Sequence, residues 1–330
     1  MTTRFVQLER FGPPQVMRWA EGPTPSPAAG EVLIEIEAVG VNFGDLMVRR
    51  GEYRRDQSLD FTPGFEAAGT VLETAPGGPA VGSRVVAFTE NGGGYATHLA
   101  TGVDHVFTVR PEVAALDAAA LFIQGVTAEY AVHRYGRVAA GETVLVPAGS
   151  GGLGGICIQL ATLAGARAIA TASTAEKLAV ARGHGAAEAI LSDPETLTAA
   201  VRELTGGRGV DVVLDGVGGP LFTPAMRALA FNGRYVVMGS ASQEAAEIDV
   251  RGLMPRGQTI AGFVVARVAE ADPAEPQRAF DRIQELFLAG DLRPAVTVMA
   301  PADLPRAHEL IESRQLTGKV VIDLSRGFDA

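Results

Sequence analysis

Several features that mark particular protein classes are scarce or missing in this 330-residue chain. Cysteine occurs once, at Cys157, which excludes an intrachain disulfide and any site built from several cysteines. Every apolar stretch is interrupted by Gly, Arg or Glu well before membrane-spanning length, and the first residues lack the apolar core of a signal peptide. We therefore expect a folded cytoplasmic protein with no membrane partner.

Positive charge is also scarce. The chain has 28 Lys and Arg against 38 Asp and Glu, a net charge of -10, and its basic residues form only short pairs such as Arg49-Arg50 and Arg54-Arg55. Such a balance repels phosphate backbones, so we expect no nucleic-acid partner. The five histidines are dispersed without the spacing of a metal site or a catalytic triad, and we expect no metal. A small molecule is the expected substrate.

The chain contains two patterns of secondary structure. Residues 31–39, 69–73 and 82–88 read as strands punctuated by Gly and Pro, which indicates a β-rich first third. An Ala-rich helical pattern covers 117–135, and strands at 143–146, 168–172, 189–191, 210–215 and 233–239 then alternate with helices at 174–184, 194–204 and 221–230. This alternation predicts right-handed crossovers and a doubly wound parallel sheet, hence an α/β protein.

The last part of the chain is expected to return to the first domain. It reads as a strand at 260–265, a long amphipathic helix at 275–289, and strand-like runs at 295–298 and 319–324 that flank a helix at 304–313.

A glycine-rich loop follows the strand at 143–146. Gly149, Gly151 and Gly154 satisfy G-x-G-x-x-G at the start of a helical run. Small residues there let backbone amides and the helix N-terminus approach a pyrophosphate, so the loop predicts a dinucleotide site. A Walker-type ATP site is disfavoured because no Gly-Lys-Ser/Thr follows the loop.

The end of the next strand indicates which dinucleotide. An NAD-preferring site usually has Asp or Glu there, whereas this chain has Ser173, with Lys177 four residues later. A hydroxyl and a cation suit the 2′-phosphate of NADPH better than a carboxylate would. The alternative is that Ser173 caps the following helix and Lys177 is a solvated side chain.

Motifs spread over nearly the whole chain carry a family resemblance. They are Ala38-Val-Gly-Val-Asn-Phe-Gly-Asp, Pro63-Gly-Phe-Glu-Ala-Ala-Gly, Gly94-Tyr-Ala, Gly125-Val-Thr-Ala-Glu-Tyr, Gly141-Glu-Thr-Val-Leu-Val, the run from Gly207 to Gly219, and Glu312-Ser-Arg-Gln-Leu-Thr-Gly-Lys. In these motifs the chain resembles the medium-chain dehydrogenase/reductases, in their zinc-free quinone oxidoreductase branch and the related enoyl reductases. The resemblance implies a GroES-like catalytic domain at 1–123 and 263–330, and a Rossmann NADPH-binding domain at 124–262.

The same resemblance implies site residues. Asn42, Tyr53 and Thr127 are the expected catalytic residues. The expected cofactor-binding residues are Asn42, Thr127, Gly149, Gly151, Gly152, Leu153, Ser173, Lys177, Ser192, Gly239, Phe263 and Arg314. The places of the catalytic-zinc Cys and His of related alcohol dehydrogenases correspond to Asn42 and Phe65, and neither side chain is a competent zinc ligand.

The resemblance leaves the substrate and the assembly open. Tyrosines of the quinone-reductase pattern appear here as Met47 and Ser192. The first substitution puts simple quinones in doubt, and the second weakens the case for a 2′-phosphate site. Alternatives are a reductase of enoyl thioesters or 2-alkenals, with Arg49, Arg50, Arg54 and Arg55 as candidates to bind the phosphates of CoA, and a non-catalytic NADPH-binding redox sensor or structural protein. A homodimer formed through the strand at 260–265 is expected.

Overall fold

The protein divides into two compact units in the computed structural model, which describes residues 2–53, 59, 61–90 and 92–328. The first unit comprises residues 1–123, 273–284 and 296–330, and the second comprises 124–272 and 285–295. Residues 263–272 and 285–295, which the sequence analysis assigned to the first domain, thus belong to the second unit. Residues 263–272 lie in the second unit because Phe263 stacks on Tyr135 of that unit, with 4.7 Å between the ring centroids.

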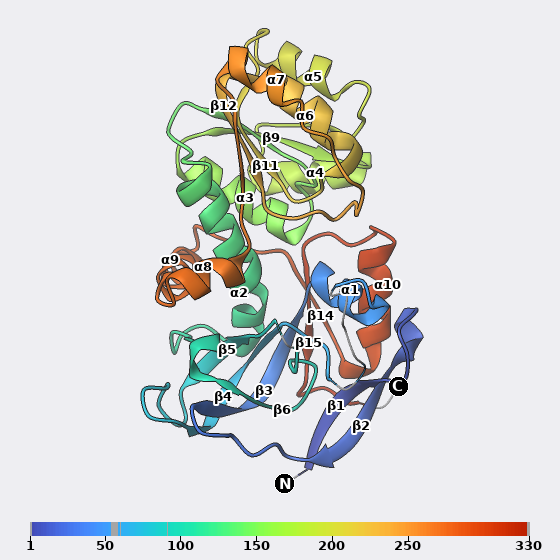
Figure 1. Cartoon of the computed structure of the whole chain (residues 1–330), viewed down its shortest axis with the longest axis vertical. Helices are drawn as coiled ribbons and strands as arrows, with labels where there is room; N and C mark the ends of the chain where they lie inside the picture. The colour runs from blue at the N-terminus through green and yellow to red at the C-terminus, as the bar shows by residue number, and fades with distance from the viewer. Residues whose placement is uncertain (1, 54–58, 60, 91, 329–330) are drawn as a thin grey trace. The chain divides into compact units, whose positions relative to one another are not determined.

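The first unit is built on antiparallel strands (Figure 1). Its main sheet has the order β14-β15-β3-β4-β5-β7, and β6 also pairs with β3. The bounds are β3 (Glu31–Val41), β4 (Glu66–Thr74), β5 (Arg84–Phe88), β6 (His98–Gly102), β7 (Val106–Thr108), β14 (Val296–Met299) and β15 (Lys319–Asp323). β1 (Thr2–Leu8) and β2 (Met17–Pro23) form a separate hairpin. Buried aliphatic side chains on alternate positions of these strands make the core.

The first unit also contains helices. They are α1 (Phe43–Arg50), α10 (Leu304–Glu312) and parts of α2 (Ala115–Glu129) and α9 (Glu275–Ala289), with 3₁₀ turns at Pro14–Val16, Val103–His105 and Pro301–Asp303. α1 follows β3 immediately, and its first turn is fixed by the bond from Asn42 N to Asp45 Oδ2 at 2.8 Å. A left-handed Gly51 with φ 77° ends α1.

The second unit contains a six-stranded parallel sheet in the order β10-β9-β8-β11-β12-β13. Its strands are β8 (Thr143–Val146), β9 (Arg167–Ala172), β10 (Glu188–Leu191), β11 (Val210–Asp215), β12 (Leu229–Val237) and β13 (Thr259–Gly262). The strand order reverses at β8, which pairs with both β9 and β11. In such sheets ligands bind outside the carboxyl ends of the strands at this reversal.

Helices connect these strands. They are α3 (Gly152–Leu163), α4 (Ala175–Gly183), α5 (Leu197–Leu204), α6 (Phe222–Ala228), α7 (Val250–Leu253) and α8 (Val265–Ala271), with a π-helical turn at Tyr130–Tyr135 and 3₁₀ turns at Gly219–Leu221 and Met254–Arg256. The predicted doubly wound sheet and the β-rich first domain are confirmed. The predicted strand at 260–265 is wrong in its last residues, because β13 ends at Gly262 and α8 begins at Val265.

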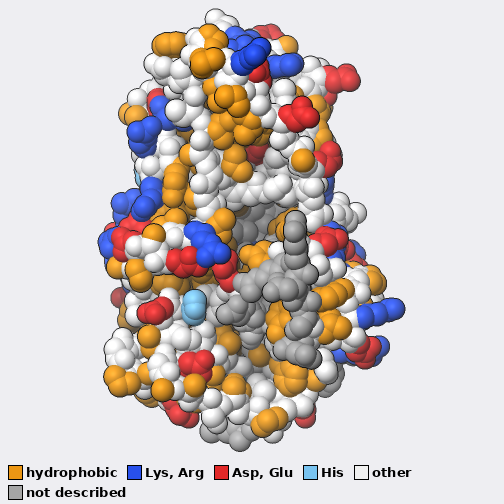
Figure 2. All heavy atoms as spheres, in the orientation of Figure 1, with side chains coloured by type: hydrophobic (Ala, Val, Ile, Leu, Met, Phe, Trp, Pro, Cys, Tyr) orange, Lys and Arg blue, Asp and Glu red, His pale blue; other side chains and the backbone are white. Residues whose placement is uncertain are grey.

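The surface carries mixed charge. On the face that Figure 2 shows, Lys and Arg side chains lie scattered among Asp and Glu side chains. Within the part of the chain that is described, no helix is both long enough and apolar enough to cross a membrane.

Candidate active site

The glycine loop lies at the carboxyl end of β8, as the motif predicts. Gly149 and Gly154 are required by packing: a Cβ on Gly149 would lie 2.7 Å from Ala170 Cβ, and one on Gly154 would lie 2.4 Å from the carbonyl oxygen of Ala148. Gly151, Gly152 and Leu153 are partly exposed at the first turn of α3. Backbone N–H groups of a first helical turn have no intrahelical acceptor, so this turn suits a phosphate group.

Gln124 adds a polar group to this loop that the sequence analysis missed. A Cβ on Gly152 would lie 2.1 Å from Gln124 Oε1, so the amide lies directly against the start of α3. Gln124 Oε1 is buried and has no hydrogen-bond partner among the residues described. The ribose hydroxyls and the nicotinamide carboxamide of a dinucleotide carry donors for such an acceptor. The open helix start and this orphaned oxygen fit a dinucleotide.

The neighbouring strand ends bring together three more predicted residues. Ser173 directly follows β9 and is exposed, and Lys177 lies in the first turn of α4. Ser192 follows β10 and donates from Oγ to Thr171 Oγ1 at 2.8 Å. The alternative in which Ser173 caps α4 is wrong, because Thr174 is the N-cap and its side chain accepts from Lys177 N.

Gly239 lies close to the loop that follows β11. A Cβ on Gly239 would be 3.1 Å from the carbonyl oxygen of Gly216, so these two strand ends approach each other closely. Asp215, the last residue of β11, holds this loop: its carboxylate accepts from the N–H groups of Val217 at 2.7 Å and Gly218 at 3.1 Å. Tyr235 also donates to Asp215, at 2.5 Å. In the sequence this aspartate is marked only by its place in the motif from Gly207 to Gly219.

Thr127 and Phe263 lie beside the π-helical turn of the same unit. Thr127 is buried near the C-terminal end of α2, which continues into the turn at Tyr130–Tyr135. Phe263 packs edge-on against Tyr130 and flat on Tyr135. π-Helical turns are rare and occur often at functional sites.

In the first unit, Tyr53 and Asn42 are both linked to Phe65, the first by ring contact and the second through Asp45. The rings of Tyr53 and Phe65 lie 4.9 Å apart, and a Cβ on Gly44 would meet Phe65 at 2.7 Å. Asp45 fixes the backbone of both motifs, since its Oδ2 accepts from Asn42 N and its Oδ1 from Phe65 N at 3.0 Å. Burial raises the pKa of the Asp45 carboxyl to about 7.

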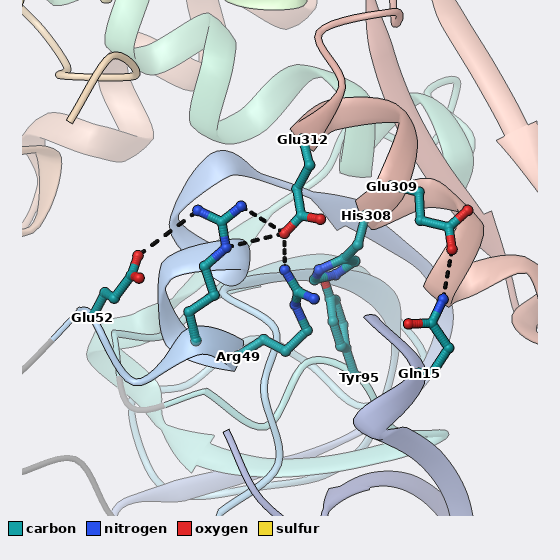
Figure 3. A network of polar contacts seen from close by, with 8 residues as sticks. Gln15, Arg49, Glu52, Tyr95, His308, Glu309 and Glu312 are labelled. Carbon is teal, nitrogen blue, oxygen red and sulfur yellow. Dashed lines mark hydrogen bonds and ion pairs between the residues drawn. The ribbon is translucent and has the colours of Figure 1, made fainter. Parts of the chain in front are cut away.

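A buried chain of polar groups continues behind Asp45 (Figure 3). Tyr95 Oη lies 3.0 Å from His308 Nε2, and Tyr95 also hydrogen-bonds the Asp45 side chain. Burial, with the charges of Arg49 and Arg50, lowers the pKa of His308 to about 3. The Tyr95 hydroxyl has one hydrogen, so it links His308 and Asp45 by donating to one of them and accepting from the other.

Arg49 and Arg50 of α1 both donate to Glu312 Oε1 of α10. The Arg49 side chain is fully buried. The suggestion that Arg49 and Arg50 bind CoA phosphates is therefore wrong for Arg49, because its charge is paired inside the fold. Arg54 and Arg55 lie outside the described residues.

Comparison with known proteins gives the family. The alcohol dehydrogenase GroES-like domain matches residues 28–148, and the zinc-binding dehydrogenase domain matches 152–285. Quinone oxidoreductase-like protein 2 of Bos taurus is 32% identical over 306 residues, which is 91% of this chain and 87% of that protein. The chain belongs to the medium-chain dehydrogenase/reductase family, and its relatives are quinone oxidoreductases. The predicted family and fold are confirmed, and the chain is an oxidoreductase.

Solved structures of family members have the same fold. A mycobacterial protein in complex with NADPH is 34% identical, with a TM-score of 0.89 over 98% of this chain and 100% of its own. The enoyl reductase CurK has a TM-score of 0.87 over 97% and 99% of the two chains, but at 24% identity it shows the fold alone.

A catalytic zinc does not fit the residues of this medium-chain oxidoreductase. Phe65 has no donor atom, and Asn42 Oδ1 accepts a hydrogen bond from the ammonium group of Lys319 at 2.6 Å. The nearby carboxylate, Glu66, is already paired with the same ammonium at 2.7 Å. In the described ranges no group of three or more His, Cys, Asp or Glu side chains is placed to hold a metal ion.

Arg314 follows α10 in the first unit. It is exposed and adopts a left-handed backbone with φ 54°, and its N–H donates to Ile311 O at 3.1 Å. This is the position after a helix where Gly is usual. Contact of Arg314 with a 2′-phosphate stays a prediction.

Proposed function

We propose that this oxidoreductase transfers hydride from NADPH to a quinone or a related conjugated carbonyl compound, without a catalytic zinc. The observation that carries the choice of cofactor is the exposed Ser173 at the carboxyl end of β9, where an NAD-preferring site would place a carboxylate. Lys177 lies one turn further on. A 2′-phosphate would meet a hydroxyl at the strand end and a cation in the first turn of α4, where Glu176 is the acidic neighbour of Lys177.

The second unit carries the residues suited to hold NADPH. The N–H groups at Gly152 and Leu153 would bind its pyrophosphate beside Gly151, whose own N–H donates to Ala148 O at 3.0 Å. Gln124 Oε1 would accept from a hydroxyl or amide of the cofactor. Bound NADPH supplies a hydride, which is two electrons and one proton. The acceptor gains one further proton from water or a nearby hydroxyl.

The first unit carries the residues proposed to orient the acceptor. Tyr53 presents a phenol beside Phe65, and Asn42 presents an amide whose oxygen accepts from Lys319 and whose nitrogen donates to Glu66. Reduction of a polarised conjugated carbonyl requires orientation and stabilisation of the developing oxyanion, not a Lewis acid to deprotonate an alcohol. Dialysis against a chelator should therefore leave turnover unchanged; a loss restored by Zn²⁺ would contradict the proposal.

The deciding assay follows NADPH oxidation with a small quinone, a 2-alkenal and a short enoyl-CoA, each beside an NADH control. We expect rapid turnover with the quinone and slower oxidation of NADH. Turnover of the thioester or the alkenal alone would establish the alternative, a reductase of enoyl thioesters or 2-alkenals, instead. NADPH binding without turnover of any acceptor would favour the non-catalytic redox sensor or structural protein.

The proposal includes a homodimer. β13 is the outer strand of its sheet, and no described strand pairs with its outer edge. Val264 just beyond it is 54% exposed. An exposed strand edge is stabilised when a second chain pairs with it. Light scattering during gel filtration should give twice the chain mass at micromolar concentration, and a monomeric mass would contradict this. The buried thiol of Cys157 is consistent with a cytoplasmic location.

A further inference from the structure

Three polar side chains meet at one edge of the first sheet. Asn42 directly follows β3, Glu66 begins β4 and Lys319 begins β15, and because β3 is antiparallel to both neighbours these positions are adjacent. Lys319 Nζ lies 2.7 Å from Glu66 Oε2 and 2.6 Å from Asn42 Oδ1. Glu66 is fully buried and the Lys319 side chain is 1% exposed, whereas Asn42 is only half-buried.

The orientation of the Asn42 amide is set by charge. Nδ2 donates to Glu66 Oε2 at 3.0 Å and to the carbonyl oxygen of Gly40 at 3.2 Å. The reversed amide would place its NH₂ against the ammonium of Lys319 and its oxygen against the carboxylate of Glu66. Both contacts would be repulsive, so only one orientation is stable.

The fold provides room for this arrangement. Gly40 is required, because a Cβ there would lie 2.4 Å from Glu66 Oε2 and 2.3 Å from the carbonyl oxygen of Ala119. The second carboxylate oxygen, Glu66 Oε1, accepts from Ile123 N at 2.7 Å. Desolvating a Lys–Glu pair is expensive, and well-packed apolar side chains often replace such a pair without loss of stability. Stability alone therefore does not account for the pair.

We propose that Lys319 and Glu66 are positioning residues for the reduction, and that they act through Asn42. Lys319 withdraws electron density from Oδ1 and so strengthens the Nδ2–H groups as donors. Both Nδ2–H groups have acceptors in the fold, and the one that donates to Gly40 O has the longer bond, at 3.2 Å, so it is the one that would be shared with an acceptor oxygen. Negative charge that develops on that oxygen during hydride transfer is met by Asn42, backed by the lysine cation. This inference rests on the proposed function.

The test combines K319M, K319R, N42A and the double variant N42A/K319M. We expect K319M and N42A each to lower kcat by about tenfold or more, while the Kd of NADPH, measured by its fluorescence, stays within about twofold. Because Lys319 acts through Asn42, adding K319M to N42A should lower kcat by no more than about twofold. K319R keeps the cation and should recover part of kcat.

A control separates positioning from simple stabilisation. Arg234 forms an ion pair with Glu142 at 2.6 Å in the other unit, and R234M should lower the melting temperature and leave kcat of the folded enzyme unchanged. Should K319M fail to fold, E66Q/K319M removes both charges and is read in the same way. Unchanged kcat in K319M, or effects of N42A and K319M that multiply, would overturn the inference.

A readout without turnover keeps this test distinct from the proposed function. Melting of the apo forms of wild type, N42A, K319M and the double variant measures the Lys319–Asn42 contact directly, and we expect strongly non-additive melting shifts. If no acceptor is reduced, the proposed function fails, while additive melting shifts would contradict the network itself.

Discussion

Individual glycines in the dinucleotide loop differ in what a side chain would meet. A Cβ on Gly152 would touch the end of the Gln124 side chain, which can rotate away, whereas a Cβ on Gly154 would meet the backbone oxygen of Ala148 at 2.4 Å. Ala148 already has φ 52°, in the left-handed region. The backbone of the loop must therefore shift to accept any residue other than glycine at position 154.

The first prediction concerns Gly154→Ala. We expect a loss of about 1–3 kcal/mol in unfolding free energy, together with weaker NADPH binding, because the displaced loop carries the phosphate-facing N–H groups. Thermal melting and NADPH fluorescence titration measure the two effects. Gly183→Ala in α4 is the control, since nothing lies within 4 Å of its Cβ. If the two variants have equal unfolding free energy and equal NADPH affinity, a steric conflict at Ala148 is contradicted.

The second prediction concerns the pH dependence of stability at His308. The pKa of this histidine is about 3 in the fold and about 6.5 when unfolded, so between these values the unfolded chain binds a proton that the folded chain cannot. Its contribution to stability is present above pH 6.5 and is lost as pH falls toward 3. Compared with His308→Gln, which keeps a donor for Tyr95, wild type should lose about 2 kcal/mol between pH 7 and pH 5.

Melting curves at the two pH values measure this difference. His105→Gln is the control, because His105 is exposed, and it should behave as wild type does. Asp45 acts in the opposite direction: burial raises its pKa to about 7, so its contribution falls as pH rises from about 4 to 7. Asp45 is present in all three proteins, so it does not affect the comparison.

The sequence identified residues whose role depends on local spacing and missed those whose role depends on tertiary contacts. The glycine loop and Ser173 could be located because a strand–loop–helix pattern fixes their place in the chain. Gln124, Asp45 and Lys319 could not, because each becomes significant only where distant segments meet: Lys319 lies 277 positions from Asn42, which it contacts.

At the level of elements, α10 is attached to α1 by a buried ion pair. The Arg49 side chain is fully buried, and Glu312, 21% exposed, supplies its counter-charge. The same helix carries Glu309, whose pair with Arg306 is largely exposed. The two glutamates therefore give a matched comparison within one helix.

We predict that Glu312→Ala costs about 3–5 kcal/mol in unfolding free energy, because it leaves Arg49 buried without its carboxylate. Glu309→Ala should cost at most about 1 kcal/mol, the usual value for an exposed pair. Chemical denaturation of both variants tests this. Similar losses in the two would mean that burial of the Arg49 charge is not what makes the contact between α1 and α10 strong.

The pattern of elements was predictable where periodicity extends over a whole element. Every strand from β8 to β12 and every helix from α3 to α6 was expected, because strands and helices alternate there with clear apolar spacing. β1, β2, β6, β7, α1, α7 and α8 were missed. α1 has only eight residues and buries the charged Asp45 and Arg49 on its inner face, so its apolar pattern is weak.

At the scale of the whole molecule, the two units have separate cores and separate parts in the proposed reaction. The core of the first unit is formed mainly by side chains of its antiparallel strands. The core of the second unit is formed mainly by side chains of β8, β9, β11 and α6. Most of the groups proposed to hold NADPH lie in the second unit, at the carboxyl ends of its strands, and Asn42 and Arg314 are the proposed contacts from the first unit. Bound cofactor should therefore raise local stability most in the second unit.

The last prediction follows from that division. Saturating NADPH should slow amide hydrogen exchange most in the loop at residues 147–155 and at the ends of β9 and β12, because a ligand bound to the native state stabilises the segments it contacts. At a concentration of 100 times Kd the gain is about 2.7 kcal/mol. NADH at the same concentration should protect less, since it lacks the phosphate that Ser173 and Lys177 are proposed to bind. Equal protection by both nucleotides would contradict that assignment, and protection confined to β1, β2 and β5 would contradict the proposed cofactor site altogether.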